Sequence, residues 1–292
     1  MKLPVFTGAC TALITPFTEC GMNFDMLETL LGLQLCAGTD AVVLCGTTGE
    51  ASTMRESEIE AVIERSAAYI GGEIPLIAGT GSNDTAHAVE RSRAAEAAGA
   101  DAVLVVTPYY NKATEEGLVR HYSMIADAVN IPVIAYNVPS RTGVDMSFSV
   151  YRRLAKHRNI CGVKEASGNL AKVSATIGEL GDDFHVWSGN DDQNVPILSL
   201  GGAGVISVLS NVCPAYVREM VHAALHGDYK KAAAMQNKIL PLIEALFSEV
   251  NPIPVKEALR MLGYAVGPCR LPLCELQNEH RAQLWDALQL LA

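Results

Sequence analysis

The chain of 292 residues has few cationic residues, few aromatic residues and no long apolar run. Lysine and arginine number 22 against 32 acidic residues, which argues against a nucleic-acid partner because phosphates are neutralised by clustered cations. No run approaches the roughly 18 apolar residues that span a bilayer, and the N-terminus has no apolar signal segment. We therefore expect a cytoplasmic protein with no membrane partner. Ordinary glycine and proline counts with abundant aliphatic residues exclude disorder and collagen.

Motifs for several common chemistries are also missing. The chain has no Walker loop, no G-x-S-x-G, no H-E-x-x-H and no C-x-x-C. His222 and His226 lie four residues apart, but no third ligand has metal spacing, so we predict a solvated helix face and no metal site. The eight cysteines are scattered and several fall in apolar runs. We expect them to be reduced thiols that act as small core residues.

Short apolar runs recur at intervals of about 20 to 35 residues, which is the main fold signal. They lie at residues 11–14, 41–45, 75–78, 102–106, 131–136, 160–164, 185–188 and 205–208. Such runs are typical of parallel strands buried on both faces. Helical patterns separate them, at residues 55–70, 86–98, 147–155 and 170–180. Eight strand–helix repeats predict an α/β protein with a (β/α)8 TIM barrel. A doubly wound open sheet is the alternative, but the first strand lacks a glycine-rich nucleotide turn.

After the eighth strand the pattern becomes purely helical, at residues 227–246, 255–262 and 279–290. We therefore predict a barrel with the active site at residues 1–225 and a small C-terminal helical domain at residues 226–292. The pattern assigns no role to the helical part.

Polar residues gather where the predicted strands end, and this is where TIM barrels carry their chemistry. Lys164 closes an apolar run, so burial should lower its pKa from about 10.4 toward neutrality. A neutral amine there forms a Schiff base with a ketone. The alternative is a lysine whose stem lies on the barrel mouth and whose ammonium group stays charged in water, where it is no nucleophile. Tyr136 ends the preceding strand, where its phenol either shuttles protons or caps a layer of the barrel.

Two loops have the composition of carboxylate-binding segments. The GTTGE turn at residues 46–50 joins a strand to a helix, and its glycines and backbone amides favour an anion. A tight turn with threonine caps would give the same pattern. Arg141 lies in a PSRTG loop, where its planar guanidinium either binds a second carboxylate or makes a surface ion pair.

Together these segments resemble the dihydrodipicolinate synthase family of pyruvate-dependent class I aldolases. The resemblance extends from about residue 6 to residue 263. It rests on GTTGE (46–50), VTPYYN (106–111), YNVPSRTG (136–143), VKEASGNL (163–170), GGAGVIS (201–207) and NPIPVK (251–256). The YNVPSRTG segment best separates this family from sister lyases such as N-acetylneuraminate lyase, which share the lysine and the glycine-rich turn.

The resemblance implies a condensation of pyruvate with aspartate 4-semialdehyde that gives 4-hydroxy-tetrahydrodipicolinate, the committed step toward diaminopimelate and lysine. In that scheme Lys164 forms an imine with pyruvate, and Thr48 with the backbone at Ile206 holds the pyruvate moiety. Arg141 binds the carboxylate of the second substrate. The covalent imine replaces any metal or organic cofactor.

The resemblance also implies a proton relay of Tyr136, Thr47 and Tyr110, with Tyr110 supplied by the neighbouring subunit of a tight dimer. The family is usually a homotetramer built as a dimer of dimers. Two alternatives remain: a sister aldolase for another 2-keto acid, such as a 2-keto-3-deoxy sugar acid, and a catalytically silent barrel that binds a 2-keto acid as a sensor.

Lysine-inhibited members of the family carry a pocket at the dimer interface. The matching positions here are Ala51, Ser52, Glu56, Ile59, Asn83, His87 and Tyr109. Glu56 and Ile59 stand where the sensitive type has histidines, and His87 replaces an acid. We therefore predict weak or absent feedback inhibition by lysine.

Overall fold

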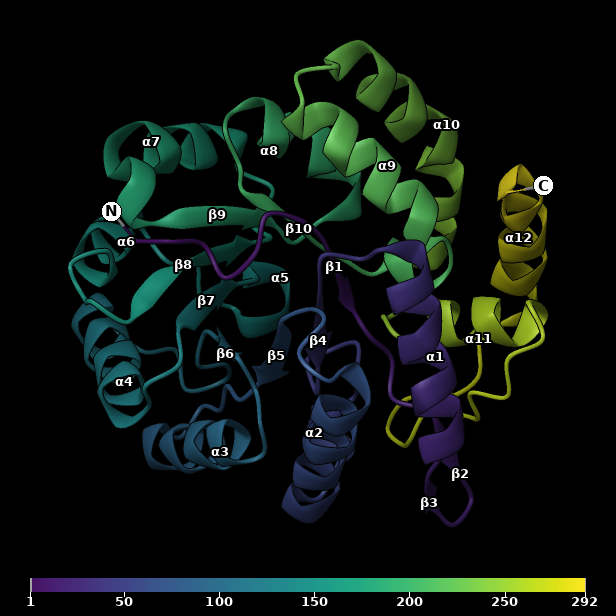
Figure 1. The fold of residues 1–292 in the computed structure, drawn as a ribbon, viewed down its shortest axis with the longest axis horizontal. Helices are drawn as coiled ribbons and strands as arrows, with labels where there is room; N and C mark the ends of the chain where they lie inside the picture. Colours follow the sequence, from purple (N-terminus) through teal and green to yellow (C-terminus); the bar gives the residue numbers. More distant parts are fainter. Residues whose placement is uncertain (1, 292) are drawn as a thin grey trace.

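The computed structural model describes residues 2–291 and shows a closed barrel of eight parallel strands wrapped by helices (Figure 1). Each strand pairs with its neighbours in the chain, and β10 pairs with β1 to close the barrel. The predicted (β/α)8 architecture is confirmed. The barrel strands are β1 (Gly8–Ala12), β4 (Ala41–Leu44), β5 (Leu76–Gly79), β6 (Ala102–Val106), β7 (Val133–Asn137), β8 (Ile160–Glu165), β9 (His185–Ser188) and β10 (Gly204–Ser207).

Helices cover the outside of the barrel, and a short hairpin of β2 (Phe17–Thr18) and β3 (Gly21–Met22) follows β1 (Figure 1). The helices that follow the barrel strands are α1 (Phe24–Ala37), α2 (Glu56–Ile70), α3 (Thr85–Ala97), α4 (Glu115–Ala128), α5 (Pro139–Thr142), α6 (Phe148–Leu154), α7 (Leu170–Leu180), α8 (Asn194–Ser199) and α9 (Pro214–Leu225). The C-terminal helices are α10 (Tyr229–Leu246), α11 (Ile253–Met261) and α12 (Asn278–Leu288). Short 3-10 turns are η1 (Ala51–Thr53), η2 (Gly181–Asp183), η3 (Asp191–Gln193), η4 (Leu209–Asn211) and η5 (Gln289–Leu291).

The predicted helices agree with the observed ones to within two residues, but the first strand was placed too late. It begins at Gly8 rather than Thr11, because its first half consists of small residues that give no β-branched signal. Gly8 pairs with Gly204 of β10, and a Cβ on Gly204 would lie only 2.3 Å from the carbonyl oxygen of Gly8. Backbone pairing therefore defines this part of the strand.

Side chains alternate between two cores, one inside the barrel and one between the strands and the helices. Trp187 fills part of the inner core and donates its indole N–H to the backbone oxygen of Phe6 at 3.2 Å. None of the eight cysteines forms a disulfide. Only three are buried as the sequence led us to expect, and they are Cys10, Cys45 and Cys161. Cys213 and Cys269 are partly buried against the same core, so the prediction of core thiols is wrong only for Cys20, Cys36 and Cys274, which are exposed.

The first two helices after residue 225 pack on the barrel's outer layer, and α12 packs on those two helices. Helix α10 contacts α8, α9 and α12, and α11 contacts the η4 turn that follows β10. The division of the chain at residue 225 stays a prediction. Among residues 2–291 no helix has both the length and the apolarity to cross a membrane.

Candidate active site

Lys164 lies near the carboxyl end of β8 with its side chain inside the barrel mouth. The residue is 5% exposed, and in the described chain its ammonium group makes no hydrogen bond or ion pair. Burial lowers the pKa of Lys164 to about 8, because a charged amine is poorly solvated there. The amine is therefore neutral in an appreciable fraction of molecules near physiological pH, as the sequence predicted.

Tyr136 lies on the neighbouring strand β7, directly beside Lys164. The two residues are register partners, and Nζ of Lys164 lies 4.5 Å from the centroid of the Tyr136 ring. Burial raises the pKa of Tyr136 to about 12, so its phenol keeps its proton at neutral pH. The site thus places a neutral amine next to a hydroxyl that can donate a proton.

A cavity of about 190 Å³ opens above this pair. Its lining includes five of the predicted site residues: Lys164, Tyr136, Thr47, Thr48 and Arg141. A second cavity of about 230 Å³ adjoins it and shares Thr47, Tyr136 and Arg141. The structure therefore gathers an amine, hydroxyls and a guanidinium around one space, from four different strand ends and loops, which suits a small anionic substrate.

Two predicted site residues lie outside the lining of both cavities. Ile206 on β10 is buried in the inner core of the barrel, as register partner of Cys10. Tyr110 is 90% exposed and has a φ of 72°, in the left-handed region that a tyrosine rarely adopts. Within a single chain Tyr110 therefore does not reach Lys164.

The GTTGE turn is held from the C-terminal part of the chain, which the sequence analysis left without a role. Glu50 has a left-handed φ of 56°, and its carboxylate lies 2.5 Å from Nζ of Lys256 on α11. The backbone N–H of Arg270 donates to the same carboxylate at 2.8 Å. Asn251 donates from Nδ2 to Oγ1 of Thr48 at 2.9 Å. These contacts fix a strained turn in one conformation.

Asn251 and Lys256 are thus functional candidates that the sequence reasoning missed. Both belong to the NPIPVK segment, which contributed to the family resemblance but received no role. The signal that would have found them is a polar residue at each end of an otherwise apolar segment: Asn251 is 5% exposed and Lys256 is 1% exposed. Polar groups that deeply buried need partners, and here the partners belong to the active-site turn.

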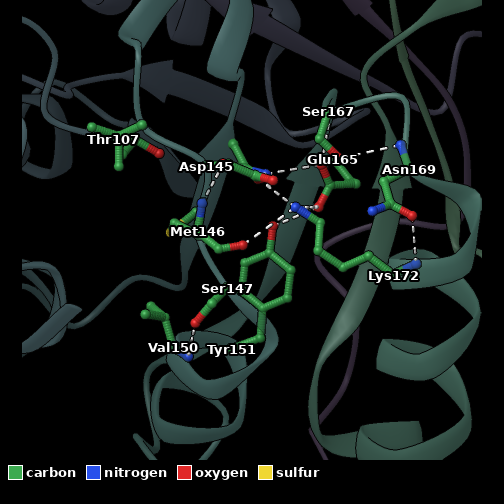
Figure 2. A network of polar contacts seen from close by, with 12 residues as sticks. Thr107, Asp145, Met146, Ser147, Val150, Tyr151, Glu165, Ser167, Asn169 and Lys172 are labelled. Carbon is green, nitrogen blue, oxygen red and sulfur yellow. Dashed lines mark hydrogen bonds and ion pairs between the residues drawn. The ribbon is translucent and has the colours of Figure 1, made fainter. Parts of the chain in front are cut away.

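The carboxylate of Glu165, which follows Lys164 in the chain, lies in a separate polar network beside Tyr151 and Lys172 (Figure 2). Glu165 accepts hydrogen bonds from the Tyr151 hydroxyl at 2.5 Å and from Nδ2 of Asn137 at 3.0 Å. Nζ of Lys172 on α7 lies 3.6 Å from the Glu165 carboxylate. Because successive strand residues face opposite sides, this carboxylate stays outside the barrel and does not pair with Lys164. Asn137 and Glu165 also tie β7 to β8 just beyond Tyr136 and Lys164.

Among the seven positions predicted for regulation, three line the larger cavity: Ala51, Ser52 and Tyr109. Ile59 is buried in the core, and the backbone oxygen of Asn83 accepts a hydrogen bond from Asn111 at 2.9 Å. The remaining two form an ion-pair cluster with a residue that the sequence analysis did not single out. Glu56 lies 3.1 Å from Nε2 of His87 and 3.2 Å from Nε of Arg91.

The two histidines set aside as metal candidates are not simply solvated. Nε2 of His222 lies 2.8 Å from the Asp40 carboxylate, and the ring of His226 lies 6.0 Å from the His222 ring. The prediction of a solvated face is therefore wrong for His222, which is half-buried because Asp40 precedes β4 close to α9. Residues 2–291 hold no group of three or more metal-ligating side chains.

Comparisons with known proteins match nearly the whole chain. The model of the dihydrodipicolinate synthetase family matches residues 5–291. A 4-hydroxy-tetrahydrodipicolinate synthase from Thermoanaerobacter sp. (strain X514) is 52% identical over 287 residues, which cover 98% of this chain and 97% of the relative. The crystal structure of the chloride-inhibited dihydrodipicolinate synthase from Acinetobacter baumannii complexed with pyruvate is 43% identical with a TM-score of 0.95, covering 97% of this chain and 98% of that one. The structure of the Cyanidioschyzon merolae enzyme with lysine bound is 36% identical, also with a TM-score of 0.95, over 98% of each chain.

Proposed function

Because the chain belongs to the dihydrodipicolinate synthetase family, we propose that it condenses pyruvate with L-aspartate 4-semialdehyde to give 4-hydroxy-tetrahydrodipicolinate. The enzyme is a lyase of lysine and diaminopimelate biosynthesis. The observation that best supports the mechanism is the buried amine of Lys164, which has no hydrogen-bond or ion-pair partner among residues 2–291 and lies beside the phenol of Tyr136.

The reaction begins when the neutral Nζ of Lys164 attacks the keto carbon of pyruvate. A proton donated by the Tyr136 hydroxyl lets the adduct lose water, which leaves a protonated imine. The imine draws electrons from the neighbouring methyl group, so that a methyl proton can pass back to the hydroxyl relay. The resulting enamine attacks the aldehyde carbon of the second substrate and forms the new carbon–carbon bond. Cyclisation releases the product and frees the lysine. The imine is the electron sink, so the proposal includes no metal or organic cofactor.

The two substrate carboxylates have separate partners in this proposal. Thr48, with the backbone at Ile206, holds the carboxylate of pyruvate, and the guanidinium of Arg141 holds that of aspartate 4-semialdehyde. Support comes from the cavity, which Thr48 and Arg141 both line. A guanidinium binds a carboxylate through two parallel hydrogen bonds, which fixes the aldehyde for attack.

Proton transfers are carried by Tyr136, Thr47 and Tyr110, the last from a neighbouring subunit. Tyr136 and Thr47 line the cavities, whereas Tyr110 projects from its own chain, almost fully exposed and with an unusual backbone angle. An exposed tyrosine with a strained backbone fits a residue that completes another subunit's site. The proposed assembly is a cytoplasmic homotetramer made of two such dimers.

Feedback inhibition by lysine is weak or absent in this proposal. The Glu56 carboxylate is already bound by His87 and Arg91, and the Ile59 side chain is buried. These two positions therefore provide no free group that could bind a lysine molecule. We expect little or no loss of turnover in the presence of low-millimolar lysine, measured in a coupled assay. Inhibition at micromolar to low-millimolar lysine would contradict this part of the proposal.

The decisive experiment is borohydride trapping in the presence of pyruvate, followed by mass spectrometry. We expect an adduct on Lys164 and turnover when aspartate 4-semialdehyde is added. If a sugar acid is cleaved and the semialdehyde is not used, the chain is a sister aldolase. If no adduct forms, the barrel binds its ligand without imine chemistry.

A further inference from the structure

Asn251 connects the two residues proposed to bind the substrate carboxylates. It lies between α10 and α11, is 5% exposed and lines the cavity that contains Lys164. Its side chain donates from Nδ2 to Oγ1 of Thr48 at 2.9 Å. Its backbone oxygen accepts from Nη2 of Arg141 at 3.2 Å. One residue of the helical extension thus contacts both anion-binding groups, through different atoms.

The direction of the bond to Thr48 has a chemical consequence. An amide nitrogen can only donate, so Oγ1 of Thr48 is the acceptor, and its single hydroxyl proton must point elsewhere. Thr48 is 4% exposed, and within the described chain this proton has no other acceptor. A hydroxyl that accepts one hydrogen bond is also a better donor in a second one. The open direction is the cavity in which a keto acid would bind.

We propose that Asn251 is a positioning residue that makes Thr48 a hydrogen-bond donor to the carboxylate of pyruvate. The inference rests on the proposed function and adds a source of specificity to it. Because Asn251 reaches Arg141 only through its backbone, its side chain acts on pyruvate alone.

The surrounding contacts keep Asn251 in place. Lys256, five residues further along, is bound to Glu50 of the same turn that carries Thr48. Ile253 and Val255 between them are buried. The segment is therefore held against the GTTGE turn at both ends, and the Asn251 amide can turn away only by breaking its hydrogen bond to Thr48.

The test measures the pyruvate concentration that gives half-maximal borohydride trapping on Lys164, in the full-length enzyme. Asn251→Ala removes the donor and should raise this concentration about fivefold, the usual size of one hydrogen bond between neutral groups. Asn251→Asp should raise it about 100-fold, because a carboxylate can only accept and so takes the Thr48 proton for itself. The KM for aspartate 4-semialdehyde should change less than threefold in both variants.

Two further variants separate this role from simpler ones. Asn190→Asp adds a negative charge to the wall of the same cavity without contacting Thr48, and should raise the pyruvate concentration much less than Asn251→Asp. Thr48→Val leaves residue 251 unchanged and should raise it in the same direction. In the Thr48→Val background, Asn251→Ala should have no further effect, because the two groups act as one unit.

The proposal is overturned if Asn251→Asp traps pyruvate like the wild type, if Asn190→Asp matches it, or if the effects of Thr48→Val and Asn251→Ala simply add. Thermal melts of each variant identify a general loss of folding, which would raise the requirement for both substrates. If the wild type itself forms no adduct, the proposed function fails and the role of Asn251 fails with it. If the wild type forms the adduct and Asn251→Asp needs the same pyruvate concentration for half-maximal trapping, only the role of Asn251 is rejected.

Discussion

Two lysines of this chain are buried in different regions, and they have opposite surroundings. Lys164, at the mouth of the barrel, has an aromatic ring beside it and no anionic partner within the described chain. Lys256, on α11, lies 2.5 Å from the Glu50 carboxylate, donates to the backbone oxygen of Pro268 at 3.0 Å, and lies over the ring of Phe17. Burial lowers the pKa of both amines.

The comparison teaches that burial alone does not make an amine reactive. At Lys256 the carboxylate holds the proton on the ammonium, so the residue serves as a buried ionic link. Glu165, which follows Lys164 in the chain, is directed to the other face of the strand and is satisfied there by Tyr151 and Asn137. The Asp191 carboxylate, whose charge acts on Lys164, accepts two backbone N–H groups and forms no ion pair with the amine. A nucleophilic lysine therefore requires both a dry site and the removal of nearby anions.

The largest expected effect is the loss of imine formation when Lys164, the barrel-mouth lysine of the comparison, is replaced. Lys164→Ala should abolish trapping of pyruvate and reduce turnover more than 1000-fold, roughly the scale of a lost covalent nucleophile, while the fold is retained. Mass spectrometry after borohydride treatment, with circular dichroism for the fold, measures both. Wild-type turnover in this variant would remove Lys164 from the mechanism.

The second effect is on stability and concerns the other lysine. Lys256→Met leaves the Glu50 carboxylate buried without its ionic partner, so the free energy of unfolding should fall by about 3–5 kcal/mol in urea titrations. The double variant Glu50→Gln with Lys256→Met removes both charges and should recover part of that loss. If the single variant is as stable as the wild type, the pair does not hold the GTTGE turn.

A third effect tests whether the Lys164 region is completed from another subunit. Tyr110→Phe should slow turnover by about 10- to 1000-fold if its hydroxyl carries protons, while Lys164 is still trapped with pyruvate. Tyr109→Phe, the matched variant next to it, should have a smaller effect. Unchanged turnover in Tyr110→Phe would exclude its hydroxyl from the relay.

The smallest effect is a pH dependence that only Lys164 should produce. Its pKa is lowered to about 8, so the neutral amine becomes scarcer as pH falls below that value. The rate of imine formation should therefore rise about tenfold per pH unit below pH 8 and level off above it. Stopped-flow or quenched trapping at saturating pyruvate measures the profile. A midpoint near 10.4 would mean that the amine is solvated.

Much of the fold and part of the site could be predicted from the sequence. The apolar runs and the amphipathic helices between them implied the barrel, since a strand buried on both faces needs consecutive apolar residues. Lys164 and Tyr136 were recognisable because each ends such a run with a polar group. The start of β1 was misplaced, because pairing of small residues with β10 leaves no side-chain pattern.

The role of the C-terminal segment could not be predicted in the same way. Asn251 lies 203 residues from Thr48 in the chain, and Lys256 is similarly remote from Glu50. No periodicity links positions so far apart, because their contact depends on how α10 and α11 return over the barrel. Arg91 was missed and His222 was wrongly predicted to be solvated for the same reason, as their partners Glu56 and Asp40 belong to other segments of the chain.

By itself the sequence determined which elements form, since local spacing of apolar residues decides whether a segment can bury a strand or a helix face. It also determined that a lysine ends an apolar strand. Only the tertiary structure decided that this lysine has no anionic partner in the described part of the chain, whereas Lys256 has one. Whether an amine stays charged depends on distances between groups that folding alone brings together.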